Sequence, residues 1–463
     1  MKKMAKKLDL TLELIEKFDV PVPRYTSYPM VPHWTDSYGN QDHIKHLEKA
    51  STSSDPISFY IHIPFCYRHC FFCGCNVKIT NNRSMTENYL DLLEKEIKTV
   101  TKYLGEDKKI SQLHLGGGTP THLEPRQLDQ LMDIVESHFT LAQGAEQSIE
   151  VHPSVTTEEH IDVLKSRGFN RLSMGVQDFD PLVQEKINRF QTFEETKKLI
   201  EYARMLEFLS VNTDLIYGLP YQTHEGFEDT LKKIIEIKPD RLAVYSYAHL
   251  PTVMKHQSIF PIEVIPVGPN KMNLFLQARN ALLDNGYEAI GFDHFSLPTD
   301  DLYVAEQNKT LLRNFMGYTT QAGRDMVSVG FSSISDVTYG YSQNTKNYPQ
   351  YTDMIENEGL AIVKGLSLSE EDVINKEAIM KFMCQYTYDP KPMADYYEKV
   401  GKKDHMNEIY QNLDHFIDIN MLTKSNGVYE ATDLGKVFAR IVASNFDTYI
   451  KNSVKTHAYS KAV

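Results

Sequence analysis

Short hydrophobic runs alternate with amphipathic segments over the first 250 residues of the chain. The runs typical of buried strands cover 57–63, 111–115, 147–151, 170–176, 209–217 and 241–249. Between them, apolar residues recur at helical spacing over 86–104, 126–138, 157–167, 193–206 and 224–237. Strands that alternate with helices in this way predict a parallel sheet with helices packed against it.

Six such units fit an open barrel better than a closed barrel of eight. The predicted fold class is therefore α/β: an open, three-quarter parallel β/α barrel with a smaller, mainly helical C-terminal domain. The carboxyl ends of parallel strands meet at one rim. The candidate functional residues lie at or just after such strand ends, which places them together.

The pattern changes after about residue 260. A helix is expected over 268–286 and a strand over 287–292, whereas 310–345, rich in Gly, Ser, Thr and Tyr, is expected to form an elaborate loop region. From 366 the chain reads as helical, with a hairpin-like stretch over 422–435. We predict three parts: an N-terminal arm that acts as a lid (1–36), a barrel domain (37–365) and a C-terminal helical domain (366–463).

Four of the five cysteines lie within residues 66–75, directly after the first predicted strand. Cys66, Cys70 and Cys73 have the spacing C-x3-C-x2-C, and no comparable partner group lies elsewhere in the chain. An iron–sulfur cluster usually takes four thiolates, so three on one tight loop would leave one iron open to a substrate or cofactor. Cys75 is too close to Cys73 to reach the same cluster, and we expect it to line the pocket.

Two other uses of clustered thiols can be weighed against the cluster. A disulfide framework is typical of short secreted chains, and this chain is long and has no secretion signal. A zinc site with His62 or His69 as its fourth ligand stays open as an alternative. Cys384 lies in a predicted helix and is expected to be a small core residue.

Charge and hydropathy narrow the range of partners. The net charge is 49 − 62 = −13, which argues against sequence-independent nucleic-acid binding. A polyanionic substrate would need a local basic pocket. No run of about 18 apolar residues occurs, so no membrane span is expected. Clustered thiols without a targeting segment favour a cytoplasmic location.

Further candidate residues follow the predicted strands. Gly116, Gly117 and Gly118 precede Thr119 and let the backbone approach a ligand closely, although a simple tight turn would need the same residues. Several polar residues lie at or near strand ends, and a salt bridge or a surface position is the structural alternative for each of them: Glu150, Gln177, Arg189 and Asp214.

These segments together resemble a known family. The motifs are PRYTSYP (23–29), IPFCYRHCFFCGCN, GGGTPT, SIEVHP, RLSMGVQDF, DLIYGLP, YAHLPT, GFDHF and RNFMGYTTQ. They are similar to the radical S-adenosylmethionine superfamily and, more narrowly, to the oxygen-independent coproporphyrinogen III oxidases. The likeness extends from PRYTSYP to NFDTYI at 445–450, nearly the whole chain.

The resemblance implies a set of cofactors and their ligands. Cys66, Cys70 and Cys73 would hold one [4Fe–4S] cluster, and S-adenosylmethionine would chelate the open iron. Two molecules of S-adenosylmethionine are implied. The first would meet Tyr60, Gly117, Glu150 and Ile334, and the second Phe72, Gly118, Thr119, Gln177, Arg189, Asp214 and Ala248. No side chain is implied as a catalytic acid or base, because the radical arises at the cluster.

Two positions depart from the family pattern. Met316 stands where the family has Gln, which contacts the second cofactor molecule, and His152 stands where the family has Asp. The first departure concerns the second site, and neither touches the cluster ligands. Cys75 belongs to the family-specific Gly-Cys-Asn continuation.

The implied activity is anaerobic oxidative decarboxylation. A 5′-deoxyadenosyl radical would abstract a β-hydrogen from a propionate of coproporphyrinogen III, and loss of CO2 and one electron would leave a vinyl group. Two propionates would react, giving protoporphyrinogen IX for heme biosynthesis. The resemblance also implies an electron donor such as flavodoxin or ferredoxin, and we expect a monomer.

Two arginines are candidates for the substrate's carboxylates. Arg24 and Arg313 each lie in a motif-like segment that is otherwise short of charge; an ordinary ion pair is the alternative for both. Relatives with the same core suggest two other functions, a radical heme-modifying methyltransferase and a heme chaperone. The chaperones lack the last cysteine of the cluster segment and much of the arm, and both are present here.

Overall fold

The core of the fold is a run of six parallel strands. The computed structural model describes residues 12–18, 20–321, 323 and 325–451. Each parallel strand is hydrogen-bonded to the next: β1 (Ile57–Ile63), β4 (Lys109–Gly117), β5 (Thr140–Val151), β6 (Arg171–Gln177), β7 (Ser210–Tyr217) and β8 (Arg241–Ser246). The six hydrophobic runs therefore predict the right strands, although β4 and β5 begin earlier than their apolar centres suggest.

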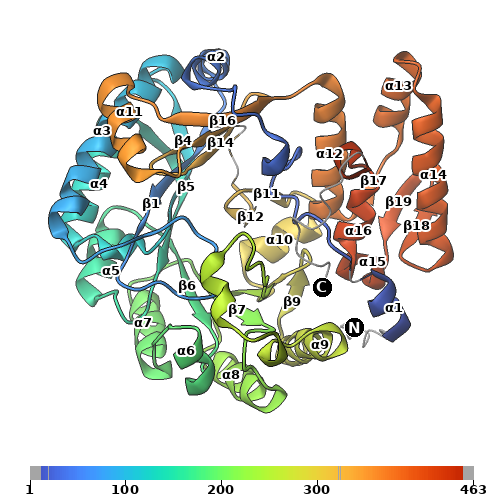
Figure 1. Ribbon diagram of the computed structural model, residues 1–463, viewed down its shortest axis with the longest axis horizontal. Coiled ribbons are helices and arrows are strands. Elements are labelled where there is room, and N and C mark those ends of the chain that lie inside the picture. The colour runs from blue at the N-terminus through green and yellow to red at the C-terminus, as the bar shows by residue number, and fades with distance from the viewer. Residues whose placement is uncertain (1–11, 19, 322, 324, 452–463) are drawn as a thin grey trace.

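Helices cover the outer face of this curved sheet (Figure 1). They connect successive strands and bury their apolar sides against them: α3 (Arg83–Leu104), α4 (Pro125–His138), α5 (Glu158–Ser166), α6 (Pro181–Lys186), α7 (Phe193–Met205), α8 (His224–Ile237) and α9 (Gly268–Asp284). Phe59 and Ile61 of β1 are fully buried, as are Leu113 and Leu115 of β4. The apolar character of these strands is therefore explained by helix packing on the sheet.

Capping residues fix where several helices begin. Thr192 precedes α7, its hydroxyl accepts a hydrogen bond from the backbone N–H of Glu195 at 3.0 Å, and the Glu195 carboxylate accepts one from the Thr192 N–H at 2.8 Å. This reciprocal pair satisfies two N–H groups that a helix start leaves open. Thr157 and Thr223 accept comparable bonds at the starts of α5 and α8.

Additional strands extend both edges of the parallel sheet. At one edge lie β10 (His294–Ser296) and β9 (Glu288–Ile290), both antiparallel to their neighbours. At the other edge β13 (Met326–Val329) runs parallel to β1 and is followed by β14 (Ile334–Val337), β15 (Gly340–Asn344) and β16 (Ile362–Ser367). The whole sheet has 12 strands. The fold is the open, parallel-dominated α/β barrel that the sequence predicts.

The expectation of a loop region over 310–345 is wrong. This segment contains the hairpin β11 (Leu312–Asn314) and β12 (Gly317–Thr319), and then β13, β14 and β15. Several of its polar residues occupy buried strand positions, among them Ser328, Ser335, Ser342 and Asn344. Asn344, for example, is fully buried and donates to the Glu96 carboxylate at 2.6 Å. The polar composition therefore reflects a hydrogen-bonded interior rather than a loop.

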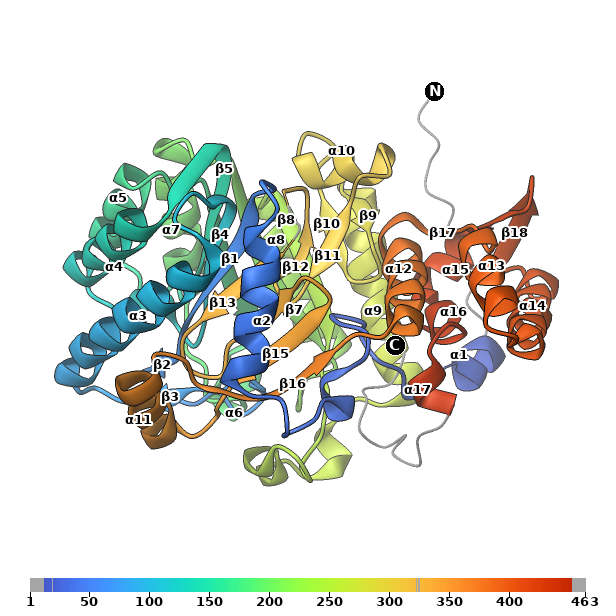
Figure 2. The ribbon, with the colours of Figure 1, turned by 90° about the horizontal axis from the view of Figure 1, so that it is seen from above.

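The C-terminal segment packs at one side of the barrel (Figures 1 and 2). It is mainly helical: α12 (Glu370–Gln385), α13 (Lys391–Lys399), α14 (Lys403–Asp418), α15 (Asp433–Val437), α16 (Ala439–Ser444) and α17 (Thr448–Lys451). The predicted hairpin is present as β18 (Leu422–Ser425) and β19 (Val428–Ala431), with β17 (Thr387–Tyr388) as a third strand. One continuous hydrophobic cluster joins this segment to the barrel.

The N-terminal arm lies between the barrel and the C-terminal helices. It contains α1 (Leu12–Phe18), and the Phe18 ring lies 5.5 Å from the ring of Phe438. Thr35 forms an isolated bridge with Gly365 of β16. Helix α2 (Asn40–Ser51) then leads into β1. The proposed domain limits at 36 and 365 stay predictions.

Two further helices complete the described part, α10 (Asp301–Gln307) and α11 (Tyr348–Glu358). Helix α11 packs against α3, where the Tyr351 hydroxyl donates to the buried Glu96 at 2.6 Å. Among the described helices, none combines the length and apolar character that crossing a membrane would require.

Candidate functional site

The cysteine segment forms a loop at the carboxyl end of β1. A short parallel pair, β2 (Phe65–Cys66) and β3 (Lys78–Ile79), joins the two ends of the loop. Within it the Cys73 N–H donates to the Cys70 carbonyl at 3.0 Å. Cys66, Cys70 and Cys73 are half-buried free thiols, and Cys75 is exposed. The loop, whose two ends are joined by β2 and β3, therefore presents four free thiols, three of them half-buried.

These thiols form part of the wall of a cavity of about 810 Å³ at the rim of the barrel. The residues that the sequence selects meet there from five strand ends. The wall includes Cys66, Cys70, Phe72, Cys73, Gly117, Gly118, Thr119, Glu150, Gln177, Arg189 and Asp214. Cys75, which was expected to line the pocket, does so.

Three selected residues lie just outside this wall. The Tyr60 hydroxyl is 3.0 Å from Nδ1 of His62, and Tyr60 pairs in register with Ser328 on the neighbouring β13. The Ser328 hydroxyl in turn donates to the Ile334 carbonyl. Ala248 is connected to the cysteine loop through Gln257, whose amide donates to the carbonyls of both Ala248 and Phe72.

Glycines in the second motif allow the backbone to approach closely. Gly117 has φ = +118°, a backbone conformation that residues with a side chain rarely adopt. A Cβ there would also lie 2.6 Å from the His62 ring. A Cβ on Gly118 would lie 2.8 Å from the backbone of Pro64 and Phe65. Both glycines are therefore required by packing against the start of the cysteine loop.

The two carboxylates of the cavity differ in their electrostatics. Enclosure by the barrel acts to raise the pKa of Glu150, but contacts with His114 at 3.6 Å and with the Gly117 N–H at 3.0 Å outweigh it and lower that pKa. Burial raises the pKa of Asp214 to about 6, and the charge of Glu150 adds to the effect. Glu150 is thus ionised at neutral pH, whereas the raised pKa of Asp214 lies close to neutral pH.

Arg189 is held against the cysteine loop. Its guanidinium donates to the Gly175 carbonyl, to Oε1 of Gln191 at 3.2 Å and to the Cys70 sulfur at 3.9 Å. Gln177, at the end of β6, has φ = +67° and a buried Oε1 that accepts no hydrogen bond within the described residues. A strained backbone and an unsatisfied polar atom are typical of a ligand-binding position.

The surroundings of the three thiols act on their ionisation in opposite directions. Burial raises the pKa of Cys66 to about 12 and also raises that of Cys70, whereas a hydrogen bond from Cys75 lowers the pKa of Cys73. Within the described chain, no three His, Cys, Asp or Glu side chains converge on one point as ligands of a single ion. The donor set is three separate thiols around one cavity, which fits the cysteine ligation of an iron–sulfur cluster.

The segment 249–260, which the sequence analysis did not select, contacts the cysteine loop. The His256 ring nitrogen lies 2.9 Å from the Cys73 carbonyl, and its ring packs 4.3 Å from that of His69. Nothing in the sequence around 249–260 marks this contact. Ser173 was also missed; it follows from the period of two along β6, which places it on the face of Gln177.

A second cavity, of about 130 Å³, continues the first toward the amino ends of the strands. The two cavities share Glu150, Ser173 and Asp214. Met316 lines the inner cavity rather than the outer one, whereas His152 lines the outer one. Both positions that depart from the family pattern thus face a cavity.

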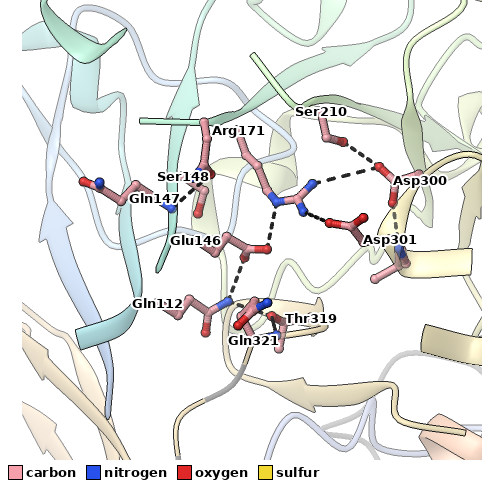
Figure 3. Close-up of polar contacts among 12 residues, drawn as sticks. Gln112, Glu146, Gln147, Ser148, Arg171, Ser210, Asp300, Asp301, Thr319 and Gln321 are labelled. Atoms are coloured by element: carbon pink, nitrogen blue, oxygen red, sulfur yellow. Dashed lines mark hydrogen bonds and ion pairs between the residues drawn. The ribbon is translucent and has the colours of Figure 1, made fainter. Parts of the chain in front are cut away.

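A buried polar network closes the far end of the inner cavity (Figure 3). Arg171 lies 2.8 Å from the Glu146 carboxylate and 2.5 Å from that of Asp301. Arg241 lies 2.7 Å from Asp300, which also accepts from Ser210 at 2.8 Å. The network connects β5, β6, β7 and β8 to the start of α10.

Comparison with known proteins gives concordant matches. Residues 60–234 match the model of the Radical SAM superfamily. The chain is 37% identical over 459 residues to oxygen-independent coproporphyrinogen III oxidase of Escherichia coli, covering 99% of this chain and 100% of that protein. The protein of the same name from Pseudomonas aeruginosa is 35% identical over 453 residues, covering 97% and 98% of the two chains.

A solved structure agrees with these sequences. Coproporphyrinogen III oxidase from Escherichia coli, described as a radical SAM enzyme, superposes with a TM-score of 0.89 at 36% sequence identity. The match covers 96% of this chain and 100% of the other. Likeness over the whole length therefore includes the arm and the C-terminal helices as well as the barrel.

Proposed function

We propose, from the premise that the chain belongs to the radical SAM superfamily and within it to the oxygen-independent coproporphyrinogen III oxidases, that it decarboxylates two propionates of coproporphyrinogen III to vinyl groups. The product is protoporphyrinogen IX. The observation that carries this proposal is the loop of three free thiols at the rim of an open barrel, beside a cavity that reaches the barrel interior.

The family implies a [4Fe–4S] cluster and S-adenosylmethionine. We assign the cluster to Cys66, Cys70 and Cys73. Three thiols on one loop leave one iron without a protein ligand, and this is the position that S-adenosylmethionine requires. When held by these three cysteines, the cluster would supply the one-electron reduction of S-adenosylmethionine that starts hydrogen removal from the substrate.

We assign the first S-adenosylmethionine to the side of the cavity next to β1, β4 and β5. Glu150 is ionised there and suits the hydroxyls of a ribose, since a carboxylate accepts two such bonds. Gly117 gives the ligand access to the backbone. Tyr60 and Ile334 support this side from β1 and β14.

A second S-adenosylmethionine would lie on the side of β6, β7 and β8. Arg189 suits the cofactor's carboxylate, because a guanidinium forms strong charge-assisted bonds with that group. The other assigned residues are Phe72, Gly118, Thr119, Gln177, Asp214 and Ala248. Met316 lines the inner cavity, so its replacement of the family's Gln removes one polar contact without altering the outer wall.

The chain's own residues contribute orientation and enclosure. The cavity is bounded by the cysteine loop and the strand ends, and the loop that carries His256 contacts the cysteine loop. Such enclosure keeps water and oxygen from a reactive intermediate. Holding donor and acceptor groups in a fixed geometry also lowers the entropic part of the barrier. A flavodoxin or ferredoxin would supply the electron to a monomeric enzyme.

The direct test is anaerobic reconstitution with iron and sulfide, followed by assay with coproporphyrinogen III, S-adenosylmethionine and a reductant. We expect protoporphyrinogen IX and CO2 in step with 5′-deoxyadenosine. A methylated linear tetrapyrrole would instead identify a heme-modifying methyltransferase. Stable heme binding without turnover would identify a chaperone.

The ligand assignment has its own test. Cys73→Ala should lose cluster iron and all activity, because only two of the three assigned ligands remain. Cys75→Ala should retain the iron and sulfide content of the wild type. Buried Cys384, remote in sequence from the loop, provides the matched control. Loss of cluster iron in Cys75→Ala would show that the fourth thiol is a ligand.

A further inference from the structure

Arg24 and Arg313, far apart in sequence, each pack on a tyrosine that lines the inner cavity. Arg24, on the arm, donates to the carbonyl of Ser246 at the end of β8 at 3.0 Å, and its guanidinium lies 5.7 Å from the ring centre of Tyr245. The guanidinium of Arg313, on β11, lies 4.5 Å from the ring centre of Tyr318. Both arginines thus pack on aromatic rings at the barrel's open edge.

Those two rings face the reaction chamber. Tyr245 and Tyr318 line the inner cavity, which shares Glu150 and Asp214 with the cavity of the cysteine loop. His294 lines the inner cavity as well, with its ring 5.1 Å from that of Tyr318. The two arginines therefore stand behind one wall of the chamber, on the side where the arm, β8 and β11 meet.

The guanidinium of Arg313 is incompletely satisfied. Its Nε and Nη1 atoms are buried and have no hydrogen-bond partner within the described residues. An unmade hydrogen bond of a buried charged group is costly, and in native structures it often marks a missing anion or water. The ring contacts with Tyr318 and Phe292 orient the guanidinium but give these N–H groups no acceptor.

One carboxylate, that of Asp293, is buried beside the arginines. Its Oδ1 lies 2.6 Å from Nδ1 of His294, and its Oδ2 has no hydrogen-bond partner within the described residues. Asp293 forms no ion pair with Arg24 or Arg313 in the part of the chain that the structure describes. The buried Arg440 lines the same small pocket as Arg24 and Asp293, so several guanidinium groups share one carboxylate in a chain whose net charge is −13. This local excess of positive charge needs an anionic partner.

We propose that Arg24 and Arg313 bind carboxylate groups of the substrate and so anchor a polycarboxylate at the end of the chamber away from the cysteine loop. This inference rests on the proposed function. Its substrate, coproporphyrinogen III, has four propionates, and only two of them react. A guanidinium binds a carboxylate through two parallel N–H bonds. Fixing the unreactive propionates at this wall would direct a reactive one toward the opposite side.

The test compares Arg24→Gln, Arg313→Gln and Arg313→Lys with the wild-type holoenzyme in the anaerobic assay. Loss of a charge-assisted hydrogen bond should raise KM for coproporphyrinogen III about 10- to 100-fold, with a smaller change in kcat. Arg313→Lys should recover part of the loss, since it keeps the charge without the paired donors. Arg126, an exposed arginine that pairs with Glu87 at 2.6 Å, provides the control Arg126→Gln, with an unchanged KM.

Binding can be measured apart from turnover. Titration with fluorescent coproporphyrin III, which carries four propionates, should show the same loss of affinity in the Gln variants. A porphyrin with two propionates should lose less. Retained cluster absorbance would show that each variant folds. If Arg313→Gln does not fold, Arg24→Gln still tests the proposal.

The outcomes separate the two proposals. A wild-type enzyme that makes no vinyl product would overturn the proposed function. A wild-type enzyme that works, together with unchanged KM and unchanged porphyrin affinity in folded Arg24→Gln and Arg313→Gln, would overturn the carboxylate site alone.

Discussion

At the scale of single residues, the cavity sets two carboxylates to different protonation states. Glu150 receives polar contacts from His114 and from the Gly117 backbone, and its pKa is lowered. Asp214 is buried with one compensating bond, from Asn212 at 2.8 Å, and its pKa is raised to about 6. Carboxylates whose environments separate their pKa values are typical of a functional site.

This difference predicts how stability depends on pH. An unfolded Asp titrates near 4, so between about pH 4 and pH 6 the folded protein holds a proton on Asp214 that the unfolded chain does not. Stability contributed by this group is therefore lost as pH rises through that range. We expect cluster-free Asp214→Asn to be more stable than wild type above pH 6, with the difference vanishing near pH 4.

Thermal unfolding across this pH range measures the effect. Exposed Asp36 supplies the control substitution Asp36→Asn. A stability difference for Asp214→Asn that is the same at every pH would contradict the assignment of the titration to Asp214.

At the scale of elements, side chains at the amino ends of the strands connect the barrel across its floor (Figure 3). Arg171 begins β6 and contacts Glu146 of β5 and Asp301 of α10. Gln112 of β4 extends the network, donating to Glu146 at 2.9 Å and to Thr319 of β12 at 2.8 Å. An open barrel lacks the closing strand pairs of a complete one. The contacts of Arg171 with Asp301 and of Gln112 with Thr319 join elements that share no backbone ladder.

Removing the central arginine should therefore destabilise the protein strongly. Arg171→Met leaves Glu146 buried without its cation, and breaking a buried pair in this way costs about 3–5 kcal/mol. Urea unfolding measures the change in the free energy of unfolding. For the exposed pair of Arg126 with Glu87, Arg126→Met should cost much less, because solvent screens the pair. An equal change in the free energy of unfolding for the two substitutions would show that the network around Arg171 does not stabilise the fold.

At the scale of the whole molecule, the arm joins the barrel to the C-terminal helices. The Tyr25 hydroxyl donates to the Asp447 carboxylate at 3.1 Å, and both residues are buried. Tyr28 contributes a second contact, between its hydroxyl and that of Thr448 at 3.0 Å. Arg24, between the barrel edge and these contacts, is therefore positioned only when arm and C-terminal helices are both in place.

Removal of the Tyr25 hydroxyl tests this dependence. Tyr25→Phe leaves the buried Asp447 with one donor fewer, which should cost about 1–3 kcal/mol in the free energy of unfolding. The Tyr202 hydroxyl donates to exposed Asp162 at 2.7 Å, so Tyr202→Phe should change stability much less, because water can replace the lost bond. Denaturant titration distinguishes the two, and a neutral Tyr25→Phe would mean that the arm is not held through this bond.

The sequence by itself determined the strands of the barrel and the segments that meet at its rim. Apolar runs and helical spacing are local, so β1 and the strands from β4 to β8 can be read from them. The spacing of Cys66, Cys70 and Cys73 is equally local, and the family motifs added Gly117, Glu150 and Arg189. Parallel strands bring their carboxyl ends to one rim, which is why these residues could be grouped before the structure was known.

Only the tertiary structure decided the remainder. Residues 310–345 look like a loop because their polar side chains find partners such as Glu96 from distant segments, and no local pattern reveals that burial. The contact of His256 with the cysteine loop and the approach of Arg24 and Arg313 to one chamber wall also join segments far apart in the chain. Such contacts depend on how the sheet curves and on where the arm crosses it, and these are properties of the packed molecule rather than of any stretch of sequence.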